Sequence, residues 1–525
     1  MKTDSGEAVA GRGQALRPHP FPFFAALATV TALVAANPDE GVRLANLTMP
    51  VMVALLIAFI GWALGGFFVR DRTRQCLISL VVTMPVLVSG YLFGWARRSG
   101  LTATAADSLE LGLVGILVVA GILGVRRITP PAADLARFLN VMTGLLILLA
   151  APALVRVATS VGVAPSVSST LTLQSDDPRP DIYLVVLDAY SGHESLSAVY
   201  GFDNSPFLDS LRARGFRIPD RPRANYTKTF LSVGTMLNRE HARALAAASA
   251  PAYRDRRAAY RALEFNRTVM DLKSFGYQFV YIGSSYPPMA INRLSDTGTG
   301  DVVSREFESM WTRMTAIFPA VRAKCRLLGC PLPSTPFEAE DASGTEQRLG
   351  ALVAATDLPG PKFVMAHLLL PHGPFRFGPT CEHRPPVWTA GPSPSPDSVV
   401  LPAYVDQVVC TNKKMLDLVD RMRAASGDSA LIILQSDHGY GRFPAGIPSD
   451  LEAAAADQVA ERFDVFAAYA GPGAVADSIA AYRTPINLFR TVFRVLWGFD
   501  EAPLPDLYYW SGPSQPMLLK GVAVD

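Results

Sequence analysis

The stretch "DIYLVVLDAYSGH" (residues 181–193) decides the fold of the C-terminal part of the chain. It begins with a short apolar run without alternation, which is typical of a strand buried on both faces of a parallel sheet. Four later runs have the same character. The five runs are Ile182–Leu187, Phe279–Ile282, Phe363–Leu370, Leu431–Leu434 and Val465–Tyr469.

Helical patterns separate these runs. The clearest are "SPFLDSLRARG", "RTVMDLKSFG", "DQVVCTNKKMLDLVDRMRAAS" and "TPINLFRTVFRVLWG". The first, second and last end in glycine, a common helix stop. Strands that alternate with helices predict an α/β fold with a doubly wound, mostly parallel sheet. In such a sheet, ligands bind beyond the carboxyl ends of the strands.

Residues that can bind metal ions follow three of the predicted strands. Asp188 comes directly after the first run, and His372 comes two residues after the third. Asp437 and His438 follow the fourth, in "ALIILQSDHGYG". Because the carboxyl ends of parallel strands meet at one edge, we expect these side chains to lie together. Carboxylate and imidazole groups suit Zn²⁺ or Mn²⁺, although either aspartate alone could simply end a strand in a turn.

The stretch "ANYTKTFLSVGT" (residues 224–235) supplies a hydroxyl group where a loop is expected to become a helix. A threonine hydroxyl is a weak nucleophile, but a divalent cation lowers its pKa. If Thr229 begins the helix, the backbone amides there favour an anionic ester, and Lys228 adds positive charge. These features predict attack on a phosphate or sulfate ester. The alternative is that Thr227 and Thr229 only cap the helix.

The N-terminal third is apolar enough to cross a membrane several times. A bilayer core about 30 Å thick needs about 20 apolar residues in a helix. Five weakly charged segments are predicted spans, of which the first and fourth are short. They are Phe21–Ala36, Leu47–Val69, Cys76–Ala96, Leu111–Val125 and Phe138–Val155. We therefore expect an all-α transmembrane domain of about five helices over residues 1–160, a linker over 161–180 and a catalytic domain over 181–525.

Basic residues orient these spans. One side of a five-span arrangement receives Lys2, Arg12, Arg17, Arg70, Arg72, Arg74, Arg126, Arg127 and Arg137, and the other receives Arg43, Arg97, Arg98 and Arg156. The positive-inside rule then places the catalytic domain of a multi-pass cell-membrane protein on the extracytoplasmic or periplasmic side. A cleaved signal peptide at the first segment would leave the same location. The net charge of +2 (48 basic and 46 acidic residues) gives no reason to expect a nucleic-acid partner.

Cysteine usage agrees with an external catalytic domain. Four of the five cysteines, Cys325, Cys330, Cys381 and Cys410, lie after the predicted spans. An even number there allows two disulfides, and we expect Cys325–Cys330 and Cys381–Cys410 among the three possible pairings. The alternative is four buried free thiols, which would better suit a reducing compartment.

Taken together, the motifs resemble the alkaline phosphatase/sulfatase superfamily. "YTKTF" is similar to the nucleophile loop of nucleotide pyrophosphatase/phosphodiesterases, and "SDHG" to the superfamily's metal-binding Asp-His pair. "LLLPHGPF" resembles the substrate-side His-Gly-Pro of lipoteichoic acid synthases and lipid A phosphoethanolamine transferases. Those two families also carry about five membrane spans before an external catalytic domain.

The resemblance implies roles for individual residues. Thr229 would be the nucleophile, His372 would contact the phosphoryl oxygens or the leaving group, and Lys228 would add charge. The metal ligands would be Asp188, Thr229, Asp437 and His438. The chain has no C/S-x-P-x-R motif, which argues against a formylglycine sulfatase. It also lacks Asp-x-x-x-His and any histidine after His438, so we expect one divalent metal, Zn or Mn, and leave open a weak second one near His372.

Three functions are consistent with these features. The first is a membrane phosphotransferase that moves a phospho-alcohol head group from a lipid donor to an envelope glycan or lipid through a phospho-threonine intermediate. The second is a phosphate- or sulfate-ester hydrolase of the same fold. The third is a catalytically degenerate cell-surface binding or scaffold protein. His367 lies inside an apolar run, so we interpret it as a hydrogen-bonded core histidine rather than a ligand.

Overall fold

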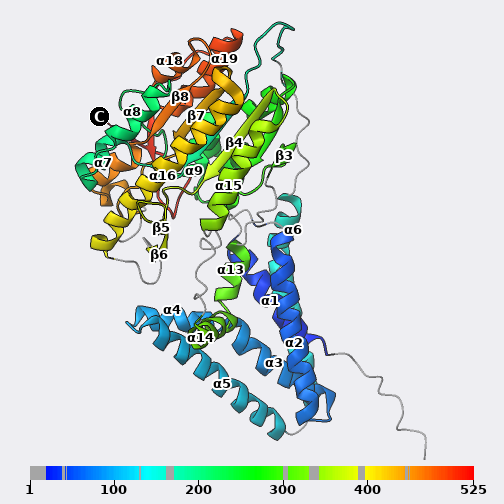
Figure 1. Ribbon diagram of the computed structural model, residues 1–525. Helices are drawn as coiled ribbons and strands as arrows, with labels where there is room; N and C mark the ends of the chain where they lie inside the picture. Colours follow the sequence, from blue (N-terminus) through cyan, green and yellow to red (C-terminus); the bar gives the residue numbers. More distant parts are fainter. Residues whose placement is uncertain are drawn as a thin grey trace, which may run out of the picture. The chain divides into compact units, whose positions relative to one another are not determined.

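The computed structural model describes residues 19–37, 42, 44–128, 132–160, 169, 171–298, 306–329, 342–387, 396–443, 447–448 and 450–524. The chain forms two compact units (Figure 1). The first comprises residues 1–38, 42–161 and 307–333, and the second comprises 39–41, 162–306 and 334–525. Residues 307–329 therefore belong to the first unit, although the sequence predicted that they belong to the catalytic domain. An amphipathic helical pattern does not reveal which core it packs against.

The first unit is all-α. Its helices are α1 (Phe21–Ala36), α2 (Thr48–Phe68), α3 (Arg72–Val88), α4 (Gly90–Arg98), α5 (Ala103–Arg127), α6 (Ala132–Ser160), α13 (Glu306–Arg313) and α14 (Ile317–Leu328). Among the described residues, four segments of 21 to 26 residues are long and apolar enough to cross a membrane: Thr48–Phe68, Arg72–Arg97, Ala103–Arg127 and Asp134–Thr159. The expected first span forms a helix of only 16 residues, α1. The fourth is longer than expected because α5 begins at Ala103.

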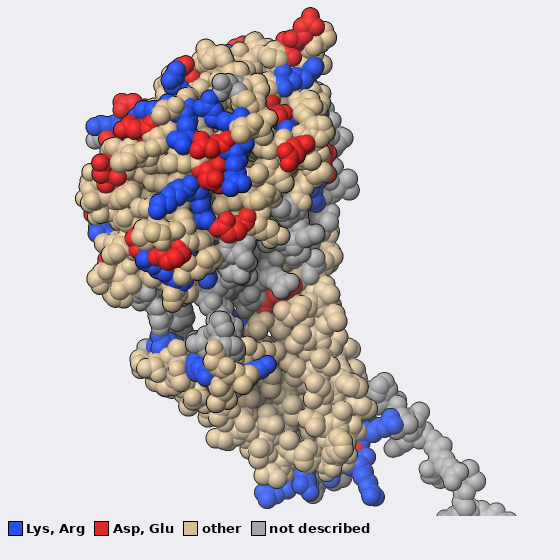
Figure 2. Space-filling model, viewed as in Figure 1, with Lys and Arg blue, Asp and Glu red and all other residues tan. Residues whose placement is uncertain are grey.

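The surface of this unit is largely uncharged, and its exposed residues include many large apolar side chains. Figure 2 shows Lys and Arg gathered at the end of it where α3 begins and α5 ends, and a few more over α4 and α14. An all-round apolar surface with a basic end is typical of helices that cross a lipid bilayer.

The second unit contains a six-stranded sheet in the order β3-β2-β4-β1-β7-β8. Its strands are β1 (Ile182–Leu187), β2 (Gln278–Ile282), β3 (Thr297–Gly298), β4 (Lys362–Leu368), β7 (Leu431–Ser436) and β8 (Ala467–Ala470). All neighbouring pairs are parallel except β7 and β8, which are antiparallel. Two hairpins, β5 (Phe375–Phe377) with β6 (His383–Val387) and β9 (Tyr508–Trp510) with β10 (Lys520–Val522), complete the strands.

Helices cover both faces of the sheet. The helices are α7 (His193–Tyr200), α8 (Ser205–Ala213), α9 (Thr229–Asn238), α10 (Arg243–Ala248), α11 (Arg257–Glu264), α12 (Arg267–Ser274), α15 (Ala342–Ala354), α16 (Asp397–Ser426), α17 (Ala456–Phe463), α18 (Val475–Ala480) and α19 (Leu488–Trp497). Alternate residues of β1 enter two separate cores: Leu184 packs with α9, α12 and α19, and Val185 packs with α8, α15 and α16. The predicted doubly wound, mostly parallel sheet is confirmed.

Candidate active site

The two aspartates predicted from the sequence lie side by side at the carboxyl edge of the sheet. β1 and β7 are adjacent and parallel, and Leu187 pairs with Ser436 at their ends. Asp188 and Asp437 are the next residues of the two strands, and both are buried. Parallel pairing in this register therefore brings together two carboxylates that are far apart in the sequence.

A sharp turn after Asp188 fixes one oxygen of Asp437. Ala189 has a φ of 61°, in the left-handed region that residues with a Cβ rarely adopt. Its N–H donates to Asp437 Oδ1 at 3.1 Å, and the N–H of His438 donates to the same oxygen at 2.8 Å. Asp437 Oδ2 has no hydrogen-bond partner among the described residues, and neither has Asp188 Oδ1. Two buried acceptor atoms are thus left for a ligand.

The imidazole of His438 presents a lone pair to the same place. Its Nδ1 lies 3.1 Å from the carbonyl oxygen of Gly439, which can only accept, so Nδ1 carries the proton. The Nε2 atom lies 3.4 Å from Thr229 Oγ1, 3.3 Å from Asp437 Oδ2 and 3.9 Å from Asp188 Oδ1. The other three predicted ligand atoms therefore lie within 3.9 Å of His438 Nε2.

The Thr229 hydroxyl lies at the start of α9, as the sequence predicted. Lys228 occupies the N-cap position, and the first-turn amides of α9 face the same end as the hydroxyl. Lys228 is half-buried, and burial, together with the charges of Arg462 and Arg256, lowers its pKa to about 7. A helix N-terminus beside a cluster of cations favours an anionic group next to Thr229.

His367 also reaches this centre, so its interpretation as a fully hydrogen-bonded core histidine is wrong. It is the penultimate residue of β4, and its Nδ1 lies 2.6 Å from Ser284 Oγ. Its Nε2 lies 3.5 Å from Asp188 Oδ2 and has no hydrogen-bond partner in the described residues. Asp188, His367 and Asp437 have ligand atoms within 4.8 Å of one another, as one metal ion requires. The apolar neighbours of His367 concealed this in the sequence.

The two carboxylates differ in their pKa. Burial tends to raise the pKa of Asp188, but the charge of His372 and the neighbouring imidazoles of His367 and His438 hold it well below its usual range. Burial and the neighbouring charge of Asp188 raise the pKa of Asp437 to about 7. Burial and then Arg462 depress the pKa of His438, which keeps this imidazole neutral. A cation would relieve the repulsion between the two aspartates.

Arg462 is a site residue that the sequence analysis missed. It is the penultimate residue of α17 and is buried. Its Nη2 donates to His438 Nε2 at 3.0 Å and to the Thr227 carbonyl at 2.9 Å, and its Nη1 donates to the Gly439 carbonyl at 2.9 Å. The guanidinium therefore ties the Asp-His loop to the nucleophile loop. No motif around Arg462 signals this position.

His372 is held at the site by α16. Its backbone and that of Pro371 accept hydrogen bonds from Gln407 Nε2 at 2.9 and 3.1 Å. Gln407 Oε1 accepts from the N–H groups of Arg376 and Phe377 in the following strand, at 2.7 and 3.3 Å. One buried amide therefore brackets the His372 loop from both sides. His372 itself is close enough for its charge to act on Asp188.

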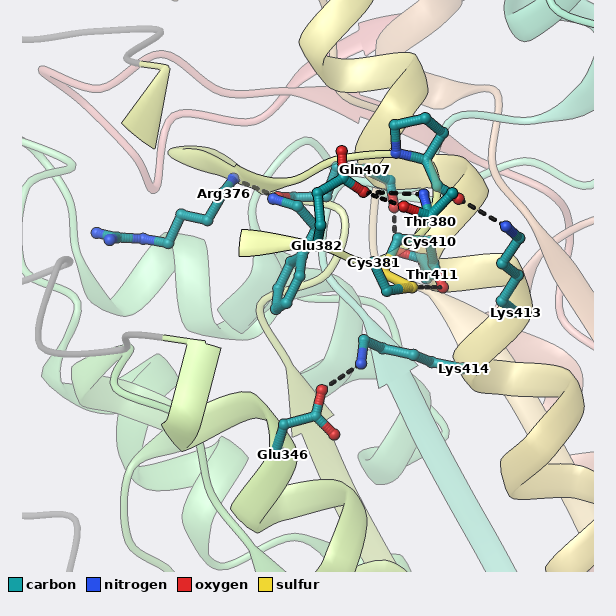
Figure 3. The surroundings of a disulfide bond; sticks show 12 residues. Glu346, Arg376, Thr380, Cys381, Glu382, Gln407, Cys410, Thr411, Lys413 and Lys414 are labelled. Atoms are coloured by element: carbon teal, nitrogen blue, oxygen red, sulfur yellow. Dashed lines mark hydrogen bonds and ion pairs between the residues drawn. A yellow bond between two sulfur atoms is a disulfide. The ribbon is translucent and has the colours of Figure 1, made fainter. Parts of the chain in front are cut away.

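A disulfide fixes the same hairpin to α16. Figure 3 shows Cys381, in the loop between β5 and β6, bonded to Cys410 one turn along α16 from Gln407. The expected Cys381–Cys410 pair is thus confirmed. The other expected pair, Cys325–Cys330, lies outside the described residues because Cys330 does. Of the described cysteines, Cys76 is free.

Comparisons with known proteins identify several similar solved structures and one family model. No curated protein sequence matches the chain. Among solved structures, it is similar to the integral membrane protein lipooligosaccharide phosphoethanolamine transferase A from Neisseria meningitidis, at 12% identity over 92% of this chain and 96% of that one, with a TM-score of 0.39. The C-terminal periplasmic domain of EcEptC from Escherichia coli, in complex with Zn, matches at 12% identity over 67% and 96%, with a TM-score of 0.42.

A phosphonate monoester hydrolase of Agrobacterium radiobacter matches at 13% identity over 63% of this chain and 80% of that one, with a TM-score of 0.40. The family model described as Sulfatase matches residues 180–499, more than half of the chain. These residues hold every group of the candidate active site, and in the part of the chain that the structure describes, four helices long enough to cross a membrane precede them. The chain therefore belongs to the sulfatase family.

Proposed function

We propose that the chain is a metal-dependent membrane phosphotransferase. It takes a phospho-alcohol head group from a membrane lipid, forms a phospho-Thr229 intermediate, and passes the group to an envelope glycan or lipid. The observation that carries this proposal is the position of the Thr229 hydroxyl. It lies at the N-terminus of α9 and 3.4 Å from His438 Nε2, beside two aspartates with unpartnered oxygens.

The chemistry of the buried atoms fits a divalent cation. Two carboxylates and neutral imidazole suit Zn²⁺ or Mn²⁺. The orphaned oxygens of Asp188 and Asp437 and the Nε2 of His367 would otherwise remain buried without partners, which is costly. We propose Asp188, Thr229, Asp437 and His438 as ligands and His367 as a further one. The lone pair of His438 Nε2 would then bind the cation in place of its hydrogen bond from Arg462. A bound cation would lower the pKa of the Thr229 hydroxyl and offset negative charge on the phosphoryl oxygens.

The chain's own residues account for the rest of the chemistry. The Thr229 oxygen bonds to phosphorus as the bond from phosphorus to the lipid alcohol breaks, and the departing alcohol takes up a proton. His372 Nδ1 donates to the carbonyl of Gly373 at 2.5 Å, so its Nε2 remains to contact the phosphoryl or leaving oxygen. Lys228 and the α9 amides favour the anion. An acceptor hydroxyl then attacks phosphorus, and Thr229 leaves.

The membrane unit supports a lipid donor. When the donor lipid stays in the bilayer, an enzyme anchored in the same membrane meets it more often. Tethering raises the effective concentration of the donor lipid at the active site. The basic residues at one end of the spans support an extracytoplasmic or periplasmic site for the sulfatase unit. Envelope glycans and lipids are the acceptors available on that side.

The experiment that tests this proposal is mass spectrometry of Thr229. The full chain, purified in detergent, is incubated with head-group-labelled phospholipid and digested. We expect an adduct on the peptide that contains Thr229, with the mass of the phospho-alcohol. Thr229→Ala should give no adduct, and Thr229→Ser should retain one because it keeps a hydroxyl. A labelled product formed equally well by Thr229→Ala would overturn the proposal.

A hydrolase of the same fold is the second candidate, since the loops around the site decide the acceptor. It would release free head group at every acceptor concentration tested, still through Thr229. A third candidate, a degenerate binding or scaffold protein, would bind no metal and be indifferent to Thr229→Ala. The retained hydroxyl and converging acids make it the weakest of the three.

A further inference from the structure

Helices α13 and α14 leave the sulfatase part of the sequence and become part of the membrane unit. Phe307 and Trp311 of α13 are buried in one apolar cluster with residues of α1 and α2, among them Val30 and Ala54. The residues before and after this excursion, up to 298 and from 342, belong to the sulfatase unit. Between residues 298 and 342 the chain therefore passes from the sulfatase unit into the membrane unit and back.

The excursion is bonded tightly to the junction of α3 and α4. The N–H of Gly90 donates to the Met314 carbonyl at 3.1 Å, and the N–H of Ala316 donates to the Val86 carbonyl at 2.7 Å. A Cβ at Gly90 would lie 2.2 Å from the carbonyl oxygen of Arg313, so no larger residue fits there. This close backbone approach fixes the start of α14 against α4.

A buried ion cluster then fixes α14 to α5. Arg322 and Arg326 each donate to one oxygen of Asp107, whose side chain is 1% exposed. The Arg322 guanidinium also lies 4.6 Å from the centre of the Phe93 ring of α4. α4, α5 and α14 are thus joined by directional contacts.

The position of Asp107 gives the depth of this junction. Arg126, at the other end of α5, is among the basic residues that mark one membrane face. At 1.5 Å per residue, Asp107 lies about 28 Å from it along the helix, close to the thickness of a bilayer core. The junction of α4, α5 and α14 therefore lies at the opposite membrane–water boundary.

The outer side of this junction exposes residues typical of that boundary. Tyr91 and Trp95 of α4 are 68% and 56% exposed, and Leu327 and Leu328 of α14 are 86% and 69% exposed. Lys324 is also exposed, on the same side of α14 as Leu328. Amphipathic aromatic rings, leucines and a long basic side chain are what the headgroup region accommodates.

We propose that α4 and α14 form a platform that lies in the headgroup region of the membrane, on the face opposite the basic end of the spans. The platform binds phospholipid. The acyl chains contact Leu327, Leu328 and Trp95, and the phosphate groups contact Lys324. The exposed apolar residues of α5, such as Ile116 and Leu117, continue this surface into the bilayer. The platform holds the α13–α14 excursion at the membrane surface.

The test is fluorescence quenching by spin-labelled lipid, which does not depend on activity. Leu327→Cys, in a Cys76→Ser background, is labelled with a bimane dye and reconstituted as the full chain in vesicles of phosphatidylcholine and phosphatidylglycerol. The vesicles carry a nitroxide near either the headgroup end or the methyl end of the acyl chains. Asp209→Cys, at an exposed position on α8 of the sulfatase unit, is the matched control.

We expect quenching at Leu327→Cys to exceed that at the control several-fold, and to be strongest with the nitroxide near the headgroup. Quenching equal to the control would show that water or protein covers this face, and would overturn the proposal. Quenching strongest at the methyl end would also overturn it, because α14 would then lie within the bilayer core. Leu328→Cys provides an independent repeat at the neighbouring exposed position.

Discussion

The two units bury acidic side chains in opposite ways. In the membrane unit, each carboxylate oxygen of Asp107 accepts a hydrogen bond from an arginine. At the edge of the sheet, Asp188 and Asp437 lie beside each other, and each keeps one oxygen without a hydrogen-bond partner among the described residues. A buried charge that is paired serves structure, whereas a buried charge left unpaired costs stability and indicates a ligand. This contrast predicts that Asp107 is a structural acid and that Asp188 and Asp437 are functional ones.

The largest expected effect tests the unpaired acid. Asp437→Asn keeps the shape of the side chain but removes its charge, so we expect it to lose bound metal and about 10³-fold or more in turnover. Metal content by mass spectrometry and turnover of labelled lipid measure these losses. Normal metal content with full turnover would show that Asp437 is not a ligand.

The same variant should not destabilise the metal-free protein. The folded pKa of Asp437 is raised from 3.8 to about 7, so the ionised form is less favourable in the folded state. The metal-free protein therefore loses stability as the pH rises from 3.8 to about 7, and above that range Asp437→Asn removes the penalty. Thermal unfolding in chelator should show an equal or higher Tm for Asp437→Asn. A lower Tm for Asp437→Asn would contradict the claim that the unpaired charge of Asp437 destabilises the metal-free protein.

Asp107→Asn should behave in the opposite way. Removing one partner of a buried ion cluster leaves the other charges uncompensated, which costs about 3 kcal/mol. We expect a lower Tm for the detergent-solubilised protein and unchanged metal content. Arg326→Gln, which leaves the bond from Arg322 in place, should lower the Tm less. If Asp107→Asn left the Tm unchanged, Asp107 would not be structural, and the proposed difference between paired and unpaired acids would be wrong.

The sequence predicted those parts of the site that depend on local pattern. Asp188, Asp437 and His438 directly follow apolar strands, and Thr229 begins a helix after a polar loop, so each is marked by its neighbours. The parallel sheet follows from the same apolar runs. The direction of β8 does not, because an apolar run is the same in either direction and only tertiary pairing makes β8 antiparallel to β7.

The remaining parts depend on contacts that no local pattern records. His367 faces Asp188 because β4 pairs in parallel with β1, with Val186 opposite His367. Arg462 reaches His438 from a helix 24 residues later, and Gln407 reaches His372 from a helix 35 residues away. Such residues become visible only when the register and the helix packing are known.

Gln407→Ala tests whether the candidate active site also depends on a fully hydrogen-bonded side chain that holds His372 in place. Loss of the amide removes the hydrogen bonds that bracket His372, so we expect about a 10-fold fall in kcat with metal content unchanged. Gln407→Glu keeps an acceptor for the N–H of Arg376 but cannot donate to the His372 carbonyl when ionised, so its loss should be intermediate and should lessen at low pH. A pH–rate profile measures this difference. Parallel falls in kcat and Tm for both variants would assign Gln407 to structure alone.

The smallest expected effect concerns Lys228, a cation that is crowded by other cations. Its pKa is lowered from 10.5 to about 7, so the charged form is less favourable in the folded state than in the unfolded one. The penalty is complete below about pH 7, and stability rises as the pH increases from 7 to 10.5. Lys228→Met should therefore raise stability by on the order of 1 kcal/mol below pH 7 and by nothing above 10.5.

The same substitution should lower activity, because Lys228 then no longer opposes the charge of a phosphoryl group beside Thr229. A fall of about 10-fold, together with the gain in stability at low pH, would show that charge repulsion is tolerated at this position for the sake of the anionic substrate. Thermal unfolding at two pH values and turnover of labelled lipid give both quantities from one preparation. If Lys228→Met lowered the Tm below pH 7, Lys228 would have a stabilising partner, and it would belong with Asp107 among the paired charges.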